Sequence, residues 1–162
     1  MKKTIKAVLL ALVLICTPSI TADARTYVDD ETPIDVQIAC NMYGEMYNIC
    51  PELLEAMAFY ESRYTPTAQN GSCKGLMQIN TPCHKARMQA LGVTDIYDIN
   101  SNVMVAADYL AELFNQYEDV GIVLGVYHGE TNAVKRGETG NLSPYVTRIL
   151  DKSAELERAH GK

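Results

Sequence analysis

The chain has 162 residues, of which 48% are hydrophobic and 21% charged, and its formal net charge is −6. This length suits one domain with a hydrophobic core, and the composition excludes a wholly disordered chain. Beyond the N-terminus no cluster of Lys or Arg occurs. Nucleic acid and anionic membrane surfaces are therefore disfavoured as partners, because binding to either needs concentrated positive charge.

The first 24 residues have the pattern of a secretory signal peptide. Three lysines precede an apolar run over residues 7–16, and a small-residue Ala-Asp-Ala site ends at Ala24. A membrane span needs about 20 apolar residues, so we expect cleavage near Ala24, with an uncleaved anchor as the alternative. The sequence thus predicts a signal peptide over 1–24, a short lead-in over 25–34 and one domain over 35–158. The expected location is outside the cell or in the cell envelope.

Apolar periodicity predicts a mostly helical domain. The expected helices, in chain order, cover about residues 35–48, 51–62, 83–91, 102–117, 119–128 and 143–156. Pro51 and the Ser143-Pro144 pair mark two of the helix starts. Residues 75–80 are too few for a helix, and we expect an extended segment or small hairpin there. The predicted fold class is therefore all-α: a single small domain of about six helices.

Four cysteines remain after removal of the expected signal peptide, an even number that is typical of two disulfides in an exported chain. A Cys40–Cys50 bridge is disfavoured, since ten helical residues rise about 15 Å and a disulfide joins Cα atoms only about 4.4–6.8 Å apart. We expect Cys50–Cys73 with Cys40–Cys83. Zinc is the alternative, but these spacings give no close ligand pair, and we expect no metal or other cofactor.

Glu61 is the most informative residue, because it falls on the apolar face of helix 51–62 with Leu54 and Met57. Partial burial of a carboxyl raises its pKa toward neutrality, and such a group can act as a general acid. The alternative is that Glu61 lies at the solvated end of the helix. Periodicity alone does not separate the two interpretations.

The pair Glu61-Ser62, followed after a loop by the tetrapeptide Gly-Leu-Met-Gln at 75–78, resembles the catalytic core of soluble-type lytic transglycosylases in the lysozyme-like superfamily. Residues 107–110 and 126–129 are similar to the Ala-Tyr-Asn block of that family. Residues 145–149 are similar to its closing Tyr-x-x-Arg segment. The four blocks occur in order over about residues 35–152, nearly the whole expected mature chain.

The resemblance implies a lysozyme-like domain with the short extended segment beside its cleft, and peptidoglycan glycan strands as the substrate. Glu61 would be the sole catalytic acid and base. It would protonate the glycosidic oxygen between N-acetylmuramic acid and N-acetylglucosamine, and then accept the proton of the muramoyl C6 hydroxyl as a 1,6-anhydro ring closes. A hydrolysing glycosidase normally needs two carboxylates, whereas attack by the substrate's own hydroxyl removes that need.

The resemblance also implies a set of substrate-binding or supporting residues around Glu61. They are Ser62, Met77, Gln78, Tyr127, His128 and Tyr145. His128 stands where the family has Asn, and a histidine differs from Asn in size and charge. Two alternatives therefore stay open: a hydrolytic muramidase of the same fold, and a glycan-binding or assembly-accessory module with impaired chemistry. We expect a monomer, with envelope or secretion-apparatus proteins as further partners.

Other side chains are weaker candidates. His84 is a weaker candidate for a residue of the active site than those above. Asp95 and Asp98 offer a second carboxylate, although aspartates in an irregular segment more often serve turns and caps. Three tyrosines at helical spacing are expected in or near the core rather than stacked on sugars: Tyr43, Tyr47 and Tyr60.

Overall fold

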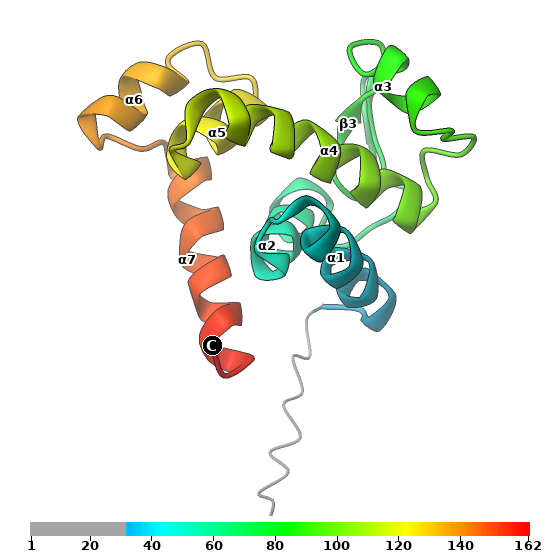
Figure 1. The fold of residues 1–162 in the computed structure, drawn as a ribbon, viewed down its shortest axis with the longest axis horizontal. Helices are drawn as coiled ribbons and strands as arrows, with labels where there is room; N and C mark the ends of the chain where they lie inside the picture. Colours follow the sequence, from blue (N-terminus) through cyan, green and yellow to red (C-terminus); the bar gives the residue numbers. More distant parts are fainter. Residues whose placement is uncertain (1–31) are drawn as a thin grey trace, which may run out of the picture.

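The computed structural model describes residues 32–162, so the expected signal peptide and all but the end of the expected lead-in lie outside the described residues. The described part holds seven helices and a three-stranded antiparallel sheet (Figure 1). This confirms the predicted class, a small and mostly helical domain with one short extended element. Among residues 32–162, no helix has the length and apolar composition needed to cross a membrane.

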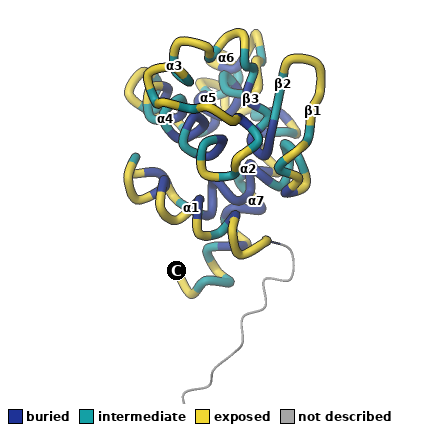
Figure 2. The backbone as a smooth tube through the Cα atoms, turned by 90° about the vertical axis from the view of Figure 1, so that its right-hand side faces the viewer, coloured by how far each residue is buried: buried dark blue, intermediate teal, exposed yellow. Residues whose placement is uncertain are grey.

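Helix α2 (Pro51–Ser62) is the central element of the fold. It packs against α1 (Ile34–Tyr47) on one side and against α7 (Pro144–Ala159) on the other (Figure 1). Leu54, Met57 and Ala58 on α2 are fully buried, and Figure 2 shows this helix among the darkest segments of the chain. As predicted, Pro51 occupies the first turn of α2, and the Ser143 side chain caps α7.

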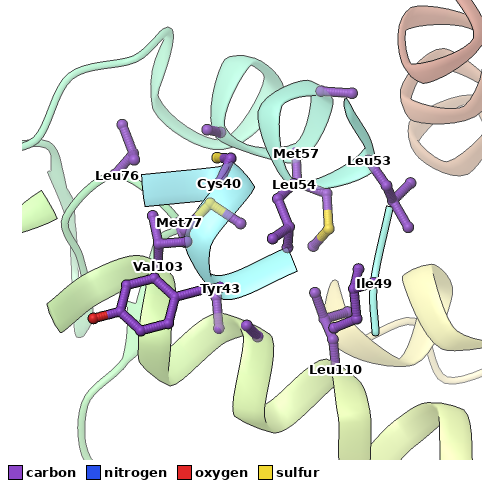
Figure 3. Packing of buried hydrophobic residues seen from close by; sticks show 14 of the residues in the cluster. Cys40, Tyr43, Ile49, Leu53, Leu54, Met57, Leu76, Met77, Val103 and Leu110 are labelled. Atoms are coloured by element: carbon purple, nitrogen blue, oxygen red, sulfur yellow. The ribbon is translucent and has the colours of Figure 1, made fainter. Parts of the chain in front are cut away.

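The core is formed where α1 and α2 meet α4 (Ile99–Tyr117). Cys40 of α1 and Leu54 and Met57 of α2 belong to this buried cluster, the Tyr43 ring of α1 lies beside Val103 of α4, and Leu110 of α4 lies below them (Figure 3). Helix α5 (Val120–Tyr127) continues from α4 and contributes further buried aliphatic side chains. The catalytic candidate Glu61 is therefore carried by the helix that the core holds most firmly.

The sheet lies beside α4 and consists of three two-residue strands, β1 (Gln69–Asn70), β2 (Cys73–Lys74) and β3 (Ile79–Asn80). Asn70 pairs with Cys73, and Cys73 pairs with Asn80. A turn at Asn70-Gly71 joins β1 to β2, with Gly71 at a φ of +58°. Helix α3 (Lys85–Ala90) follows, and Arg87 on it forms ion pairs with Asp108 and Glu112 of α4.

Helix α4 begins three residues earlier than predicted. The Asp98 side chain accepts a hydrogen bond from the Ser101 N–H at 2.8 Å and caps the helix. The Asn102 side chain does not cap the helix and instead forms the hydrogen bonds described with the candidate active site. The periodic apolar pattern located the helix, and the capping aspartate set its boundary.

Helix α6 (Ala133–Thr139) was not predicted, because residues 129–142 are polar and rich in glycine. The helix is held by a close approach to α5. A Cβ placed on Gly137 would lie 2.1 Å from Ile122 Cγ1, and one on Gly125 would lie 2.9 Å from Ala133 Cβ. Small residues at this crossing permit the packing, which overrides the weak helix propensity of the segment.

The structure does not contain the expected disulfides, since Cys40, Cys50, Cys73 and Cys83 are all free thiols. Cys50 precedes the first turn of α2, whereas Cys73 lies in the wall of the cavity that contains Glu61, near the other end of that helix. Eleven residues of helix separate these ends by about 16 Å, far beyond disulfide reach. Cys40 is fully buried on α1, and Cys83 is exposed before α3. These positions correct the pairing that we expected from the sequence.

A buried carboxylate ties the start of α2 to the end of the described chain. Glu52 is 1% exposed, and its Oε1 lies 2.7 Å from Lys162 Nζ and 2.9 Å from His160 Nδ1. Burial alone would raise the pKa of Glu52, but hydrogen bonds from Lys162, His160 and Cys50 outweigh it and lower the pKa to about 2. The contact therefore stabilises the fold only while Glu52 is ionised.

We predict that Glu52→Gln lowers the free energy of unfolding by about 3 kcal/mol at pH 7, because the folded-state pKa lies below the ordinary value near 4.5. In the parent chain this contribution is complete above pH 4.5 and disappears as the pH falls toward 2. Urea unfolding of both proteins at several pH values measures it. Equal stabilities at pH 7, or a difference that persists at pH 2, would contradict the assignment.

Candidate active site

Glu61 lies in the last turn of α2, and the backbone that follows it ends the helix abruptly. Arg63 and Tyr64 both adopt left-handed conformations, with φ values of +53° and +57°. Their N–H groups donate to the carbonyls of Phe59 at 2.9 Å and Ala58 at 3.4 Å. Two successive non-glycine residues in this region store strain, which proteins commonly concentrate at functional sites.

The tetrapeptide at 75–78 forms a tight turn opposite Glu61, and a buried amide holds it. Asn102 Oδ1 accepts from the Met77 N–H at 2.7 Å, and its Nδ2 donates to the carbonyls of Ile96 at 2.7 Å and Lys74 at 3.1 Å. Gly75 has a φ of +79°, and a Cβ there would lie 2.1 Å from Asn102 Nδ2. Only glycine fits this position.

A cavity of about 430 Å³ opens beside Glu61. Its walls come from the end of α2, the small sheet, the segment before α3, α4 and the end of α5. The lining residues are Tyr60, Glu61, Asn70, Cys73, Gln78, Ile79, Asn80, His84, Tyr109, Tyr127, His128 and Gly129. Among these described residues Glu61 carries the one carboxyl, and five aromatic or imidazole rings line the cavity with it.

Glu61 is half-buried and held by one strong hydrogen bond. The Tyr145 hydroxyl on α7 donates to Glu61 Oε1 at 2.5 Å. Burial raises the pKa of Glu61 above its ordinary value, while the Tyr145 hydrogen bond and nearby His128 oppose the rise. Burial and the Glu61 charge raise the pKa of Tyr145 strongly, so its hydroxyl stays a donor in both ionisation states of Glu61. This resolves the sequence ambiguity in favour of a carboxyl in a cleft.

His128 lies against the residue that holds Glu61. Its ring stacks on that of Tyr145, with centroids 3.7 Å apart and planes 14° from parallel. The stack fixes the Tyr145 ring from the cavity side and so helps to aim its hydroxyl. His128 also lines the cavity directly. The histidine that replaces the family's Asn is therefore part of the site.

Gln78 and Tyr127 lie in the cavity wall as expected, but each also has a structural contact. Gln78 has a left-handed backbone and donates from Nε2 to the Gly75 carbonyl at 2.9 Å. The Tyr127 hydroxyl donates to the Met77 carbonyl at 2.8 Å, so it supports the tetrapeptide turn rather than touching Glu61. Tyr145 is the tyrosine that orients the carboxyl.

Three of the expected binding residues, Ser62, Met77 and Tyr145, do not line the cavity, although Tyr145 contacts Glu61. The Met77 side chain is fully buried in the core, so its backbone, not its thioether, contributes to the site. The Ser62 hydroxyl donates to the Ala58 carbonyl at 3.2 Å and accepts from the Thr65 N–H at 3.2 Å, both local contacts at the end of α2. Their assignment as substrate-binding or supporting residues stays a prediction.

The structure adds side chains that the sequence did not single out. Tyr109 of α4 lines the cavity, with its ring centroid 4.5 Å from that of His84 and 5.6 Å from that of Tyr127. His84, the weaker candidate, is therefore part of the wall. Tyr60 lines the cavity and also packs against the core, and Tyr43 is buried in the core, as expected. Flat rings in such a wall suit the apolar faces of sugars.

The remaining acidic candidates have local structural roles. Asp95 accepts a hydrogen bond from the Tyr97 N–H at 2.9 Å, and Asp98 caps α4. Neither lines the cavity. Within residues 32–162, no group of three or more His, Cys, Asp and Glu side chains is placed to hold a metal ion. The chemistry available in the cavity is therefore proton transfer by Glu61 with support from tyrosine and histidine.

A helical domain with one half-buried glutamate above an aromatic cleft is the arrangement of a lysozyme-like domain. Comparison with known families makes the assignment specific: residues 38–143 match the model of the transglycosylase SLT domain. The chain therefore belongs to the family of transglycosylase SLT domains, and the predicted resemblance is confirmed.

One curated relative extends this comparison. Over 70 residues the chain is 31% identical to a protein described as membrane-bound lytic murein transglycosylase F from Desulfosudis oleivorans. The matched segment covers 43% of this chain and 14% of that protein. The similarity thus concerns a small part of a much longer relative.

We predict that Asn102→Asp lowers the free energy of unfolding by about 2–4 kcal/mol, because it removes two donated hydrogen bonds and leaves buried carbonyls unsatisfied. The matched control is Asn100→Asp, which adds the same charge to an exposed position of the same helix turn. Urea unfolding compares the two. Equal effects of both substitutions would contradict the role given to Asn102.

We predict that Tyr145→Phe raises the pKa of Glu61 further, because it removes the hydrogen bond that favours the ionised carboxyl. Carbon-13 NMR titration of the Glu61 carboxyl measures the change. Tyr127→Phe is the control, since that hydroxyl contacts the Met77 carbonyl. An unchanged or lowered pKa in Tyr145→Phe would refute the contact.

Proposed function

We propose that this protein is a peptidoglycan lytic transglycosylase that cleaves the β-1,4 bond between N-acetylmuramic acid and N-acetylglucosamine. The observation that carries the proposal is the single carboxyl of Glu61, half-buried in the cavity with a raised pKa and held by Tyr145. Membership of the transglycosylase SLT domain family supports it, as does the name of the curated relative.

In the first step Glu61 acts as a general acid. Burial raises its pKa and so favours the protonated carboxyl, whose proton passes to the glycosidic oxygen as the bond to the muramoyl C1 breaks. The carboxylate that forms retains the Tyr145 hydrogen bond, which stabilises the new negative charge. His128 keeps the Tyr145 ring in place during this change.

In the second step the same carboxylate acts as a base. It accepts the proton of the muramoyl C6 hydroxyl while that oxygen bonds to C1, so a 1,6-anhydro ring forms and Glu61 regains its proton. No water is consumed. The cavity wall offers no second carboxyl among the described residues, and the intramolecular hydroxyl supplies the nucleophile at high effective concentration.

The setting of this activity is part of the proposal. Cleavage near Ala24 would release the domain into the cell envelope or the exterior, where its glycan substrate lies. We expect the domain over 35–158 to act as a monomer and to meet envelope or secretion-apparatus proteins there.

We predict that Glu61→Gln retains the fold and reduces release of fragments from purified peptidoglycan by at least a factor of about 1000, because the amide cannot exchange the proton. Glu45→Gln, at an exposed position of α1, is the control and retains activity. Mass spectrometry of wild-type products identifies the reaction. Anhydro-muramoyl ends are expected.

Other outcomes of this experiment identify the alternatives. Reducing muramoyl ends would mean a hydrolytic muramidase with water as the nucleophile. Binding of glycan without release would mean a glycan-binding or assembly-accessory module, with His128 as the residue that impairs the chemistry. Full activity of Glu61→Gln would remove the basis of the proposed mechanism.

A further inference from the structure

A second cavity of about 500 Å³ adjoins the first one and is not used by the mechanism above. The two cavities share His128 and Gly129 in their walls. The second cavity also includes Tyr145, whose hydroxyl is bonded to Glu61. A group bound here would therefore lie next to the reacting bond, on the far side of the His128–Tyr145 stack.

The second cavity differs from the first in charge. Arg136 of α6 is the one Lys or Arg among the described residues that line it, and the first cavity has none. The Arg136 side chain is 39% exposed, so its guanidinium is accessible to a ligand. The Glu130 carboxylate lies in the same wall, together with polar side chains from Thr131, Asn132 and Ser143.

Contacts hold the Arg136 side chain in place but leave some of its hydrogen-bond donors unused. Its Nε lies 3.8 Å from Glu130 Oε2, at the outer limit of an ion pair, and its Nη1 donates to the Asn141 carbonyl at 3.3 Å. The other Glu130 oxygen accepts from the Ser143 hydroxyl at 2.5 Å, which keeps that carboxylate turned away from a tight pair with Arg136. A guanidinium has five donors, and these contacts use two of them.

The proposed substrate supplies an anionic group at this place. The glycosidic bond breaks at C1 of a muramoyl ring, and the same ring carries at C3 the lactyl group from which the peptide stem extends. The stem thus begins within one sugar ring of Glu61, and it bears free carboxylates. A guanidinium matches a carboxylate better than any other side chain does, because it can donate two parallel hydrogen bonds.

We propose that the second cavity binds the first residues of the peptide stem and that Arg136 pairs with a stem carboxylate. This inference rests on the proposed function, and it predicts a preference for glycan that still carries its stems. The Thr131 hydroxyl and the Asn132 amide provide hydrogen bonds for the stem backbone.

The test compares two substrates: purified glycan strands with stems, and the same strands after an amidase has removed the stems. The measured quantity is the ratio of kcat/KM on the two, which cancels any general loss of folded protein. We expect Arg136→Gln to lower this ratio about tenfold and Arg136→Lys to lower it less. The control is Lys135→Gln, whose neighbouring position on α6 lines a different cavity, and it leaves the ratio unchanged.

The inference is overturned if Arg136→Gln lowers both rates equally, which would indicate a sugar subsite or a structural role, or if it lowers neither. If the wild type cleaves neither substrate, the proposed function fails. The affinities of wild type and Arg136→Gln for both kinds of strand, measured by calorimetry, then decide the inference. The inference is supported if the wild type binds strands with stems more tightly than strands without them and Arg136→Gln does not. It is overturned if the wild type binds both kinds of strand with equal affinity.

Discussion

The hydrogen bond from Tyr145 to Glu61 is the contact on which the site depends, and the fold is built to hold it. Helices α2 and α7 pack together in opposite directions. One end of the pair is joined by Tyr145 and Glu61, and the other by Glu52 with His160 and Lys162. A carboxyl at each end of α2 therefore contacts α7. Glu52 is nearly inaccessible and serves stability, whereas Glu61 opens on a cavity and is available for chemistry.

The opposite wall of the site is positioned by buried hydrogen bonds rather than by regular structure. The strands of the small sheet have two residues each, too few to fix a turn by themselves. Asn102 from α4 and Tyr127 from α5 hold the Met77 backbone from two directions, at its N–H and its carbonyl. Left-handed backbone at Gly75 and Gln78 completes the turn. The helices thus transmit their rigidity to a segment that must approach a ligand closely.

Apolar periodicity predicted the helices that bury an apolar face. The family motifs predicted Glu61, Gln78, Tyr127 and Tyr145 as residues of the site. They missed α6, since that helix depends on Gly137 fitting against Ile122 and not on its own propensity. They also gave no signal for the role of Asn102 at the site, because its three side-chain hydrogen bonds join segments that are separate in sequence. Disulfide pairing failed for the same reason: it depends on spatial separation, which even numbers of cysteines do not encode. The motif residue Met77 was assigned to the cleft, while only its backbone reaches the site.

The most direct measurement of the central claim is a crystal structure of Glu61→Gln with a stem-bearing glycan fragment that spans the scissile bond. We expect the glycosidic oxygen to lie about 3 Å from the side chain at position 61. We also expect the Tyr145 hydroxyl to donate a hydrogen bond to that side chain. Glycan bound away from this cavity, or a side chain at position 61 turned from the sugar, would contradict it.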